Sequence, residues 1–173
     1  MLSSAFGEVA VISTTMQEAI NQQIAHEFYS SYLYLAMSAY FETLSLPGFA
    51  HWMRQQSDEE REHAMKLYDF LHDRGGAVEL KALAQPPGEF QSPLDVFQQA
   101  LEHERKVTKL IHQLNELALK ESDYATQAHL QWFITEQLEE ENNASQVIEQ
   151  LKMTGGQPAA LFMLDRELGA RAA

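Results

Sequence analysis

A glutamate and a histidine three residues apart, Glu60 and His63, are the pair whose types and spacing most directly suggest chemistry. Three residues are close to one helical turn, so both side chains would lie on one helix face. Oxygen ligands with a single nitrogen suit iron or manganese better than copper. Such a pair is frequent by chance, however, and alone it is more often a solvated surface group.

Three further carboxylates stand at comparable places in other segments of the chain. Glu27, Glu104 and Glu140, together with the amide of Gln137, interrupt apolar stripes that recur every three or four residues. Each lies near the middle of its stripe, with apolar residues toward both ends. In a helical bundle the midpoints share one height whichever way each helix runs. The stripes therefore predict one polar layer inside a bundle.

Burial of this polar layer would require a compensating positive charge. Isolated buried carboxylates are costly, and no Lys or Arg falls on the central stripes. A pair of divalent or trivalent metal ions would supply that charge. A layer that only fixes helix register without any redox work is the alternative, but it has to account for polar interruptions in four separate segments.

Long helices are the elements that would position these residues. Pro and Gly cluster at a few breaks, and the stretches between the breaks contain neither. Thr15 with Glu18 matches a capping box, Ser92 would cap a later helix, and Gly75 stands where a left-handed C-cap belongs. We expect four long helices and a short one, at about 15–44, 48–74, 93–120, 124–153 and 158–168.

The lengths of the connections predict how these helices pair. The first and third connections are short, so the helices that they join should be antiparallel neighbours, whereas 75–92 can cross the length of a bundle. The fold class is therefore all-α, a four-helix bundle with one long crossover. We expect a single domain over 1–173, with a loosely ordered lead-in at 1–13, the bundle at 15–153 and a short C-terminal helix at 158–168.

Composition excludes several classes of protein. The chain has 173 residues, 12 Lys plus Arg against 25 Asp plus Glu, a net charge of -13 and no Cys. The charge opposes nucleic-acid binding and attracts cations, and the lack of cysteine excludes a disulfide scaffold and cysteine-ligated metal sites. The first Lys or Arg is Arg54, and no apolar run reaches membrane-spanning length. We therefore expect a cytoplasmic protein with no membrane partner.

Motifs on all four long segments match one known family. They are Ser57-Asp58-Glu59-Glu60-Arg61-Glu62-His63-Ala64 with Arg74-Gly75-Gly76, Glu27-Phe28-Tyr29-Ser30-Ser31 with Tyr34, Glu102-His103-Glu104, and Trp132-Phe133-Ile134-Thr135-Glu136-Gln137. Over about 15–168 the chain resembles the bacterial non-haem ferritins. The resemblance implies a ferritin-like four-helix bundle with one long crossover and a short fifth C-terminal helix.

The resemblance also implies a di-iron ferroxidase centre inside each subunit. Glu27, Glu60 and His63 would hold the first iron. Glu60, Glu104 and Glu140 would hold the second, so that Glu60 bridges the two. Arg61 follows the bridging glutamate where bacterioferritins carry a haem-ligating Met, and no haem is therefore expected.

Other residues take roles from the resemblance alone. Gln137 would orient dioxygen or a water, and Tyr34 is a candidate electron donor. The residues that match a third iron site, sharing Glu140, are Glu59, Glu136 and Glu139. The alternative for those three carboxylates is an acidic inner-surface patch that nucleates mineral.

The function implied is that of a ferritin. Fe(II) would be oxidised by dioxygen or hydrogen peroxide and stored as ferric oxyhydroxide inside a hollow homo-oligomeric shell of twenty-four subunits, a 24-mer. One alternative is a di-iron oxygenase or peroxidase acting on an organic substrate, and another is a non-catalytic structural helical bundle. A DNA-protecting mini-ferritin is opposed by the acidic charge and the lack of a basic tail.

Overall fold

Five helices occupy most of residues 11–170, the part of the chain that the computed structural model describes, and no strand occurs within that range. Each helix begins and ends within one residue of its expected position, which confirms the all-α fold class. The predicted lead-in at 1–13 falls mostly outside the described residues. The helices are α1 (Thr14–Thr43), α2 (Pro47–Asp73), α3 (Pro93–Glu121), α4 (Tyr124–Met153) and α5 (Pro158–Leu168).

The first helix starts from a different cap than the sequence suggested. Ser13, not Thr15, is the N-cap of α1, and its Oγ accepts a hydrogen bond from the Met16 N–H at 3.0 Å. The Ser13 hydroxyl also donates to Glu121 at 2.6 Å, so this cap ties α1 to the end of α3. The predicted capping box at Thr15 was therefore wrong, because both serine and threonine can cap and only the tertiary contact favours one.

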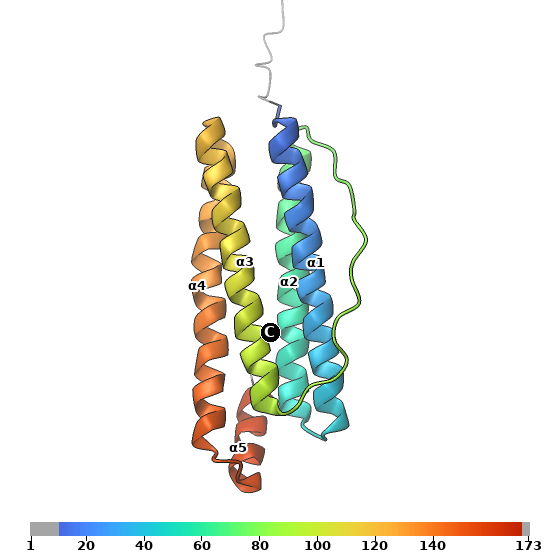
Figure 1. Ribbon diagram of the computed structural model, residues 1–173, viewed down its shortest axis with the longest axis vertical. Helices are drawn as coiled ribbons and strands as arrows, with labels where there is room; N and C mark the ends of the chain where they lie inside the picture. Colours follow the sequence, from blue (N-terminus) through green and yellow to red (C-terminus); the bar gives the residue numbers. More distant parts are fainter. Residues whose placement is uncertain (1–10, 171–173) are drawn as a thin grey trace, which may run out of the picture.

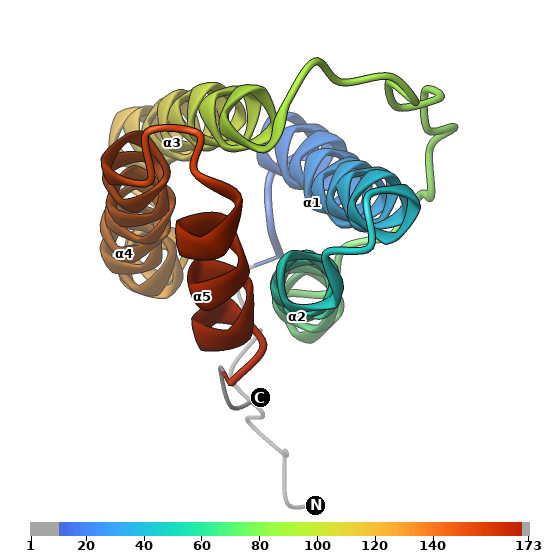
Figure 2. The same ribbon diagram turned by 90° about the horizontal axis from the view of Figure 1, so that it is seen from below.

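The long helices form two antiparallel pairs, α1 with α2 and α3 with α4 (Figure 1), and α1 also packs against α3. Seen from below, α5 lies across one end, between α2 and α4 (Figure 2). The crossover that follows α2 runs beside α1 for the length of the bundle (Figure 1). Asn21 fastens its start, since it donates to the Ala77 carbonyl at 2.9 Å and accepts from the Glu79 N–H at 2.8 Å. Within residues 11–170 no helix is long and apolar enough to cross a membrane.

The apolar core is divided into two clusters, one toward each end of the bundle. The cluster on the side of α5 includes Phe41, Phe49, Trp52, Met53 and Phe97. The cluster on the opposite side includes Ile20, Ile24, Leu67, Ile111 and Leu130. Burial of these side chains is the main favourable contribution to the free energy of folding. The polar layer lies between the two clusters.

A close backbone approach docks α5 onto the start of α2. Gly48 lies so near to α5 that a Cβ atom added there would meet the Asp165 carbonyl oxygen at 1.6 Å. The Asp165 side chain is buried, and its Oδ1 accepts from the Phe49 N–H at 3.0 Å. Helix α2 has no capping side chain of its own, so Asp165 supplies the anionic cap from another helix.

We predict that Gly48→Ala displaces α5. The added methyl group cannot fit against the Asp165 backbone, and overpacking of this kind costs about 1–3 kcal/mol of unfolding free energy. Thermal unfolding should show a lower Tm, and hydrogen exchange should show faster exchange at α5 amides. Gly88→Ala is the matched control, since nothing lies within 4 Å of a Cβ at that position. Equal stability of the two variants would contradict the close approach.

Candidate metal centre

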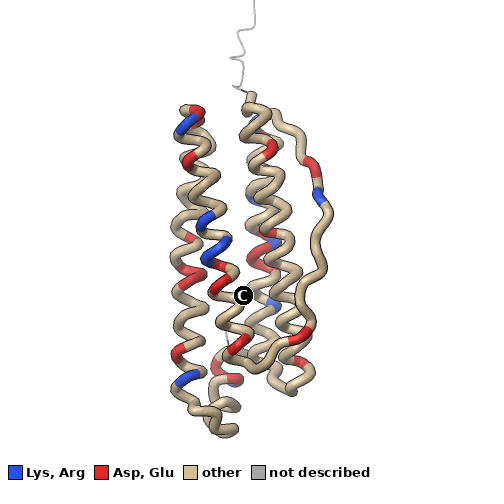
Figure 3. The backbone as a smooth tube through the Cα atoms, viewed as in Figure 1, with Lys and Arg blue, Asp and Glu red and all other residues tan. Residues whose placement is uncertain are grey.

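The middle of the bundle contains a buried layer of acidic side chains. Figure 3 shows that Asp and Glu residues occur along all the long helices, including their central parts. Four of these carboxylates come from four different helices, and each is at most 3% exposed. They lie close to the buried side chains of His63 and Gln137. The four carboxylates are Glu27, Glu60, Glu104 and Glu140.

Glu60 is the carboxyl group whose oxygens accept no hydrogen bond from an amide, a hydroxyl or the backbone, and it lies against the carboxyl group of Glu27. It is 0% exposed, and the side chains of Glu27, Glu104 and Glu140 surround it closely enough to raise its pKa. Glu27 accepts from Gln23 Nε2 at 2.8 Å on one oxygen, while its second oxygen is buried without a partner. The only donor for these three oxygens is thus a proton on one of the two carboxyl groups, which face one another.

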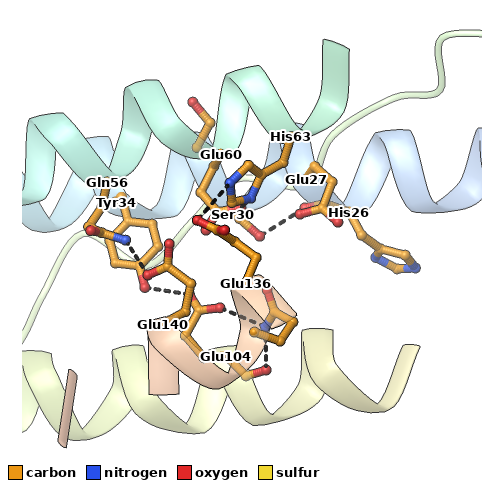
Figure 4. Close-up of polar contacts among 12 residues, drawn as sticks. His26, Glu27, Ser30, Tyr34, Gln56, Glu60, His63, Glu104, Glu136 and Glu140 are labelled. Carbon is orange, nitrogen blue, oxygen red and sulfur yellow. Dashed lines mark hydrogen bonds and ion pairs between the residues drawn. The ribbon is translucent and has the colours of Figure 1, made fainter. Parts of the chain in front are cut away.

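The other two carboxylates are held by neutral donors. Glu104 accepts from the Tyr34 hydroxyl on one oxygen and from Gln137 Nε2 at 3.2 Å on the other. Glu140 accepts from Gln56 Nε2 at 2.7 Å, across the gap between α4 and α2 (Figure 4). Gln137 therefore orients Glu104 in this structure, in addition to the role that the sequence resemblance implied for it.

His63 stands between two carboxylates. Its Nδ1 lies 3.4 Å from a Glu60 oxygen, and its Nε2 lies 4.0 Å from a Glu136 oxygen. Burial, and then the positive charge of Lys66, lower the His63 pKa to about 4. The imidazole is therefore neutral at pH 7, so these contacts are not ion pairs, and a neutral imidazole is the form that binds metals.

Two groups of side chains have ligand atoms within 4.8 Å of one another. The first is Glu27, Glu60 and His63, and the second is His63, Glu136 and Glu140. The structure thus brings together the three residues expected around the first iron. The Glu104 oxygens, which Tyr34 and Gln137 hydrogen-bond, join neither group, so among the described residues the set expected at the second iron, Glu60, Glu104 and Glu140, is not gathered as compactly.

The residues expected at a third site are less tightly gathered. Glu136 is half-buried, and burial followed by the charges of Glu139 and Glu59 raises its pKa. These three carboxylates therefore face a common region. Glu139 is exposed and Glu59 half-buried, and neither has an oxygen within the compact groups around His63.

The buried carboxyl groups Glu27, Glu60 and Glu104 all have raised pKa values. Burial raises the pKa of Glu27 to about 7, although the Gln23 hydrogen bond opposes the rise. Burial also raises the pKa of Glu60 well above its usual value, and the neighbouring carboxylates raise it further. Among the described residues, Glu27, Glu60 and Glu104 form no ion pair with Lys or Arg.

The donor set around Glu60 fits a metal ion. Buried oxygens without hydrogen-bond partners on Glu27 and Glu60, with the neutral imidazole of His63 beside them, offer hard oxygen ligands and one nitrogen. A cation placed there would satisfy these orphaned atoms and remove the repulsion that raises the carboxylate pKa values.

Sequence reasoning missed two glutamines of this layer. Gln23 bonds Glu27 from one turn away on the same helix, and Gln56 reaches Glu140 from another helix. The role of Gln56 could have been predicted in part, because Gln56 lies on the apolar stripe of its helix one turn before Glu60. An amide on such a stripe needs a buried partner, and a carboxylate of the layer was the nearest acceptor.

Comparison with known proteins gives consistent matches over most of the chain. Residues 17–154 match a family model described as a ferritin-like domain. A bacterial non-heme ferritin of Bacteroides fragilis (strain 638R) is 44% identical over 161 residues, covering 93% of this chain and 100% of that protein. A bacterial non-heme ferritin of Staphylococcus aureus (strain USA300) is 39% identical, again over 93% of this chain and over 97% of the relative.

Solved structures agree with these matches. An open pore ferritin from the hyperthermophilic archaeon Archaeoglobus fulgidus superposes with a TM-score of 0.92 at 50% identity, covering 93% of this chain and 99% of that one. A closed form of the same ferritin, engineered by site-directed mutagenesis, also gives a TM-score of 0.92 at 50% identity, covering 93% of this chain and 98% of its own.

We predict that the metal-free protein loses stability as the pH rises above 6.5, through the pKa of about 7 that burial gives Glu27. The raised pKa of Glu60 means that the native state keeps a proton that the unfolded chain releases. Each such proton costs about 1.4 kcal/mol of unfolding free energy per pH unit. The lowered pKa of His63 has the opposite effect on stability, but only at pH values below 6.5, the pKa of histidine in the unfolded chain, which lie outside this range. Thermal unfolding in a chelating buffer measures the slope.

Glu60→Gln is the control for this pH dependence. The amide cannot ionise, so its Tm should fall less steeply with pH than that of the unaltered protein. An identical slope in both proteins, or a Tm that rises over this pH range, would contradict the raised pKa.

Proposed function

The chain belongs to the ferritin family, and we propose that it oxidises Fe(II) in its mid-bundle carboxylate layer and stores the product as ferric oxyhydroxide. The observation that carries the proposal is Glu60, a fully buried carboxyl group that no amide, hydroxyl or backbone donor reaches, surrounded by three further carboxyl groups. A purely structural layer would leave this group as an uncompensated cost.

The proposal assigns two iron-binding positions to the layer. Glu27, Glu60 and His63 bind the first Fe(II), with His63 Nδ1 as the nitrogen ligand because it is the ring nitrogen nearest to Glu60. Glu60, Glu104 and Glu140 bind the second Fe(II). Glu60 bridges the two ions, which its two oxygens without other partners allow.

The side chains prepare Fe(II) for oxidation by charge and by proton control. Anionic oxygen ligands stabilise Fe(III) more than Fe(II), so the carboxylates make loss of an electron more favourable. Two Fe(II) ions side by side can give two electrons to one dioxygen, which with two protons leaves as hydrogen peroxide. Peroxide is then a second oxidant for this site.

Protons must leave the layer when Fe(II) enters it. Burial raises the pKa of Glu27 to about 7 and that of Glu60 well above its usual value, so metal binding displaces protons from these groups. Tyr34 keeps its proton because burial, and then Glu104, raise its pKa well above the usual value. It therefore stays a hydrogen-bond donor to Glu104, and this contact also makes it the nearest phenol that could supply an electron.

Iron storage requires more than an oxidation site, and the ferritin relatives suggest how this chain provides it. We propose a single ferritin-like domain per chain, assembled as a cytoplasmic homo-oligomeric shell of twenty-four subunits around a ferric oxyhydroxide core. Glu59, Glu136 and Glu139, together with Glu140, form a third iron position between the oxidation site and that core. Their mutual repulsion, visible in the raised pKa of Glu136, supports cation binding there.

The test is aerobic addition of Fe(II) to the purified metal-free protein, followed by dioxygen uptake and ferric absorbance. We expect rapid oxidation that falls by at least about 100-fold in Glu60→Ala, because the bridging ligand is lost and direct contact with the metal is worth about 3 kcal/mol or more. Ferric iron should elute with the protein in size-exclusion chromatography.

Glu62→Ala is the matched control for this experiment. Glu62 is an exposed glutamate two residues further along the same helix, so its loss should leave the oxidation rate unchanged. If the unaltered protein and Glu60→Ala oxidised Fe(II) at the same slow background rate, the layer would not be a redox site.

A further inference from the structure

The Glu140 carboxylate lies between two candidate metal positions. One of its oxygens belongs to the group that includes His63 and Glu136, on the side expected for a third iron. Figure 4 shows Gln56 and Tyr34 on the other side of this carboxylate, where Tyr34 donates to Glu104. Glu140 could therefore serve either the second iron or the third, depending on how it is turned.

Gln56 holds the Glu140 carboxylate in its orientation by a hydrogen bond. Its Nε2 donates to Glu140 Oε2 at 2.7 Å, the shortest amide-to-carboxylate hydrogen bond in the layer. Gln56 is 0% exposed and Glu140 3%, so water does not compete with this bond. The bond holds Oε2 on the side of Gln56 and Tyr34 (Figure 4), while a Glu140 oxygen stays within 4.8 Å of ligand atoms of His63 and Glu136.

The chemistry of the donor suits this task. An amide holds a carboxylate oxygen without adding positive charge, so Glu140 keeps its full negative charge for a metal. A Lys or Arg at the same place would neutralise the ligand and repel the cation. A ligand oriented by a hydrogen-bonding partner behind it is a recurrent feature of metal sites, and loss of such a partner typically weakens metal binding by 10–100-fold.

We propose that Gln56 is a positioning residue that keeps one oxygen of Glu140 for the second metal of the pair and so sets how metal divides between the pair and the third site. This inference rests on the proposed function, since it assumes that the layer binds metal. It assigns a role to a side chain that is not itself a ligand.

The test is an anaerobic titration of the assembled protein with Co(II), which binds like Fe(II) but is not oxidised under these conditions. Calorimetry counts the binding events, and the visible Co(II) spectrum reports their geometry. In Gln56→Met, which keeps the size of the side chain but removes the donor, we expect the second event to weaken by about 10–100-fold. The first event should stay within about twofold, and the third should not weaken.

Two further variants make the outcome decisive. Gln55→Met makes the same chemical change at the adjacent buried position of α2 and should bind Co(II) as the unaltered protein does. Gln56→Asn keeps an amide but is one methylene too short to reach Glu140, and it replaces Gln56→Met if that variant does not fold.

Three results would overturn the proposal, and they differ from one another. Unchanged Co(II) binding in the Gln56 variants would show that Gln56 does not position Glu140. A uniform loss of all binding events would show a merely structural role in packing. If the unaltered protein bound no Co(II), the proposed function itself would fail, and the inference with it.

Discussion

Four carboxyl groups from four helices are buried together, and this is the constraint on which the rest of the structure depends. Within residues 11–170, three of them, Glu27, Glu60 and Glu104, form no ion pair with Lys or Arg. Burial opposes ionisation of these three groups, and the charges of neighbouring carboxylates oppose it further. The bundle can hold such a layer because apolar clusters on both sides of it supply the folding free energy. The two apolar clusters thus stabilise the fold on either side of the polar layer.

The hydrogen bonds of the layer follow one rule, which is that donors are neutral. Gln23 holds Glu27, Gln56 holds Glu140, and Tyr34 with Gln137 holds Glu104. Neutral donors fix the direction of a carboxylate but leave its charge for a cation. Glu60 has no such donor, and it is also the residue that must contact two ions in the proposed mechanism. The pattern of contacts and the proposed division of roles therefore agree.

Much of the fold and the height of the layer could be predicted from the sequence, because both depend on features that act along one helix. Pro and Gly mark the breaks, and apolar periodicity marks the buried face of each helix. Contacts between helices were harder to predict. The Gln56 bond to Glu140 and the capping of α2 by Asp165 depend on the rotation and register of helices distant in the chain. The choice of Ser13 over Thr15 as the first cap has the same origin, since Glu121 decides it. The roles of the ten candidate site residues stay predictions.

Anomalous diffraction at the iron absorption edge, from crystals soaked in Fe(II) without oxygen, tests the central claim most directly. The account predicts two strong peaks inside each bundle, one beside Glu27 and His63 and one beside Glu104 and Glu140, with Glu60 contacting both. A layer with no anomalous peak, in crystals that bind iron elsewhere, would contradict it. The buried carboxylates would then be a structural feature and not the place where iron is oxidised.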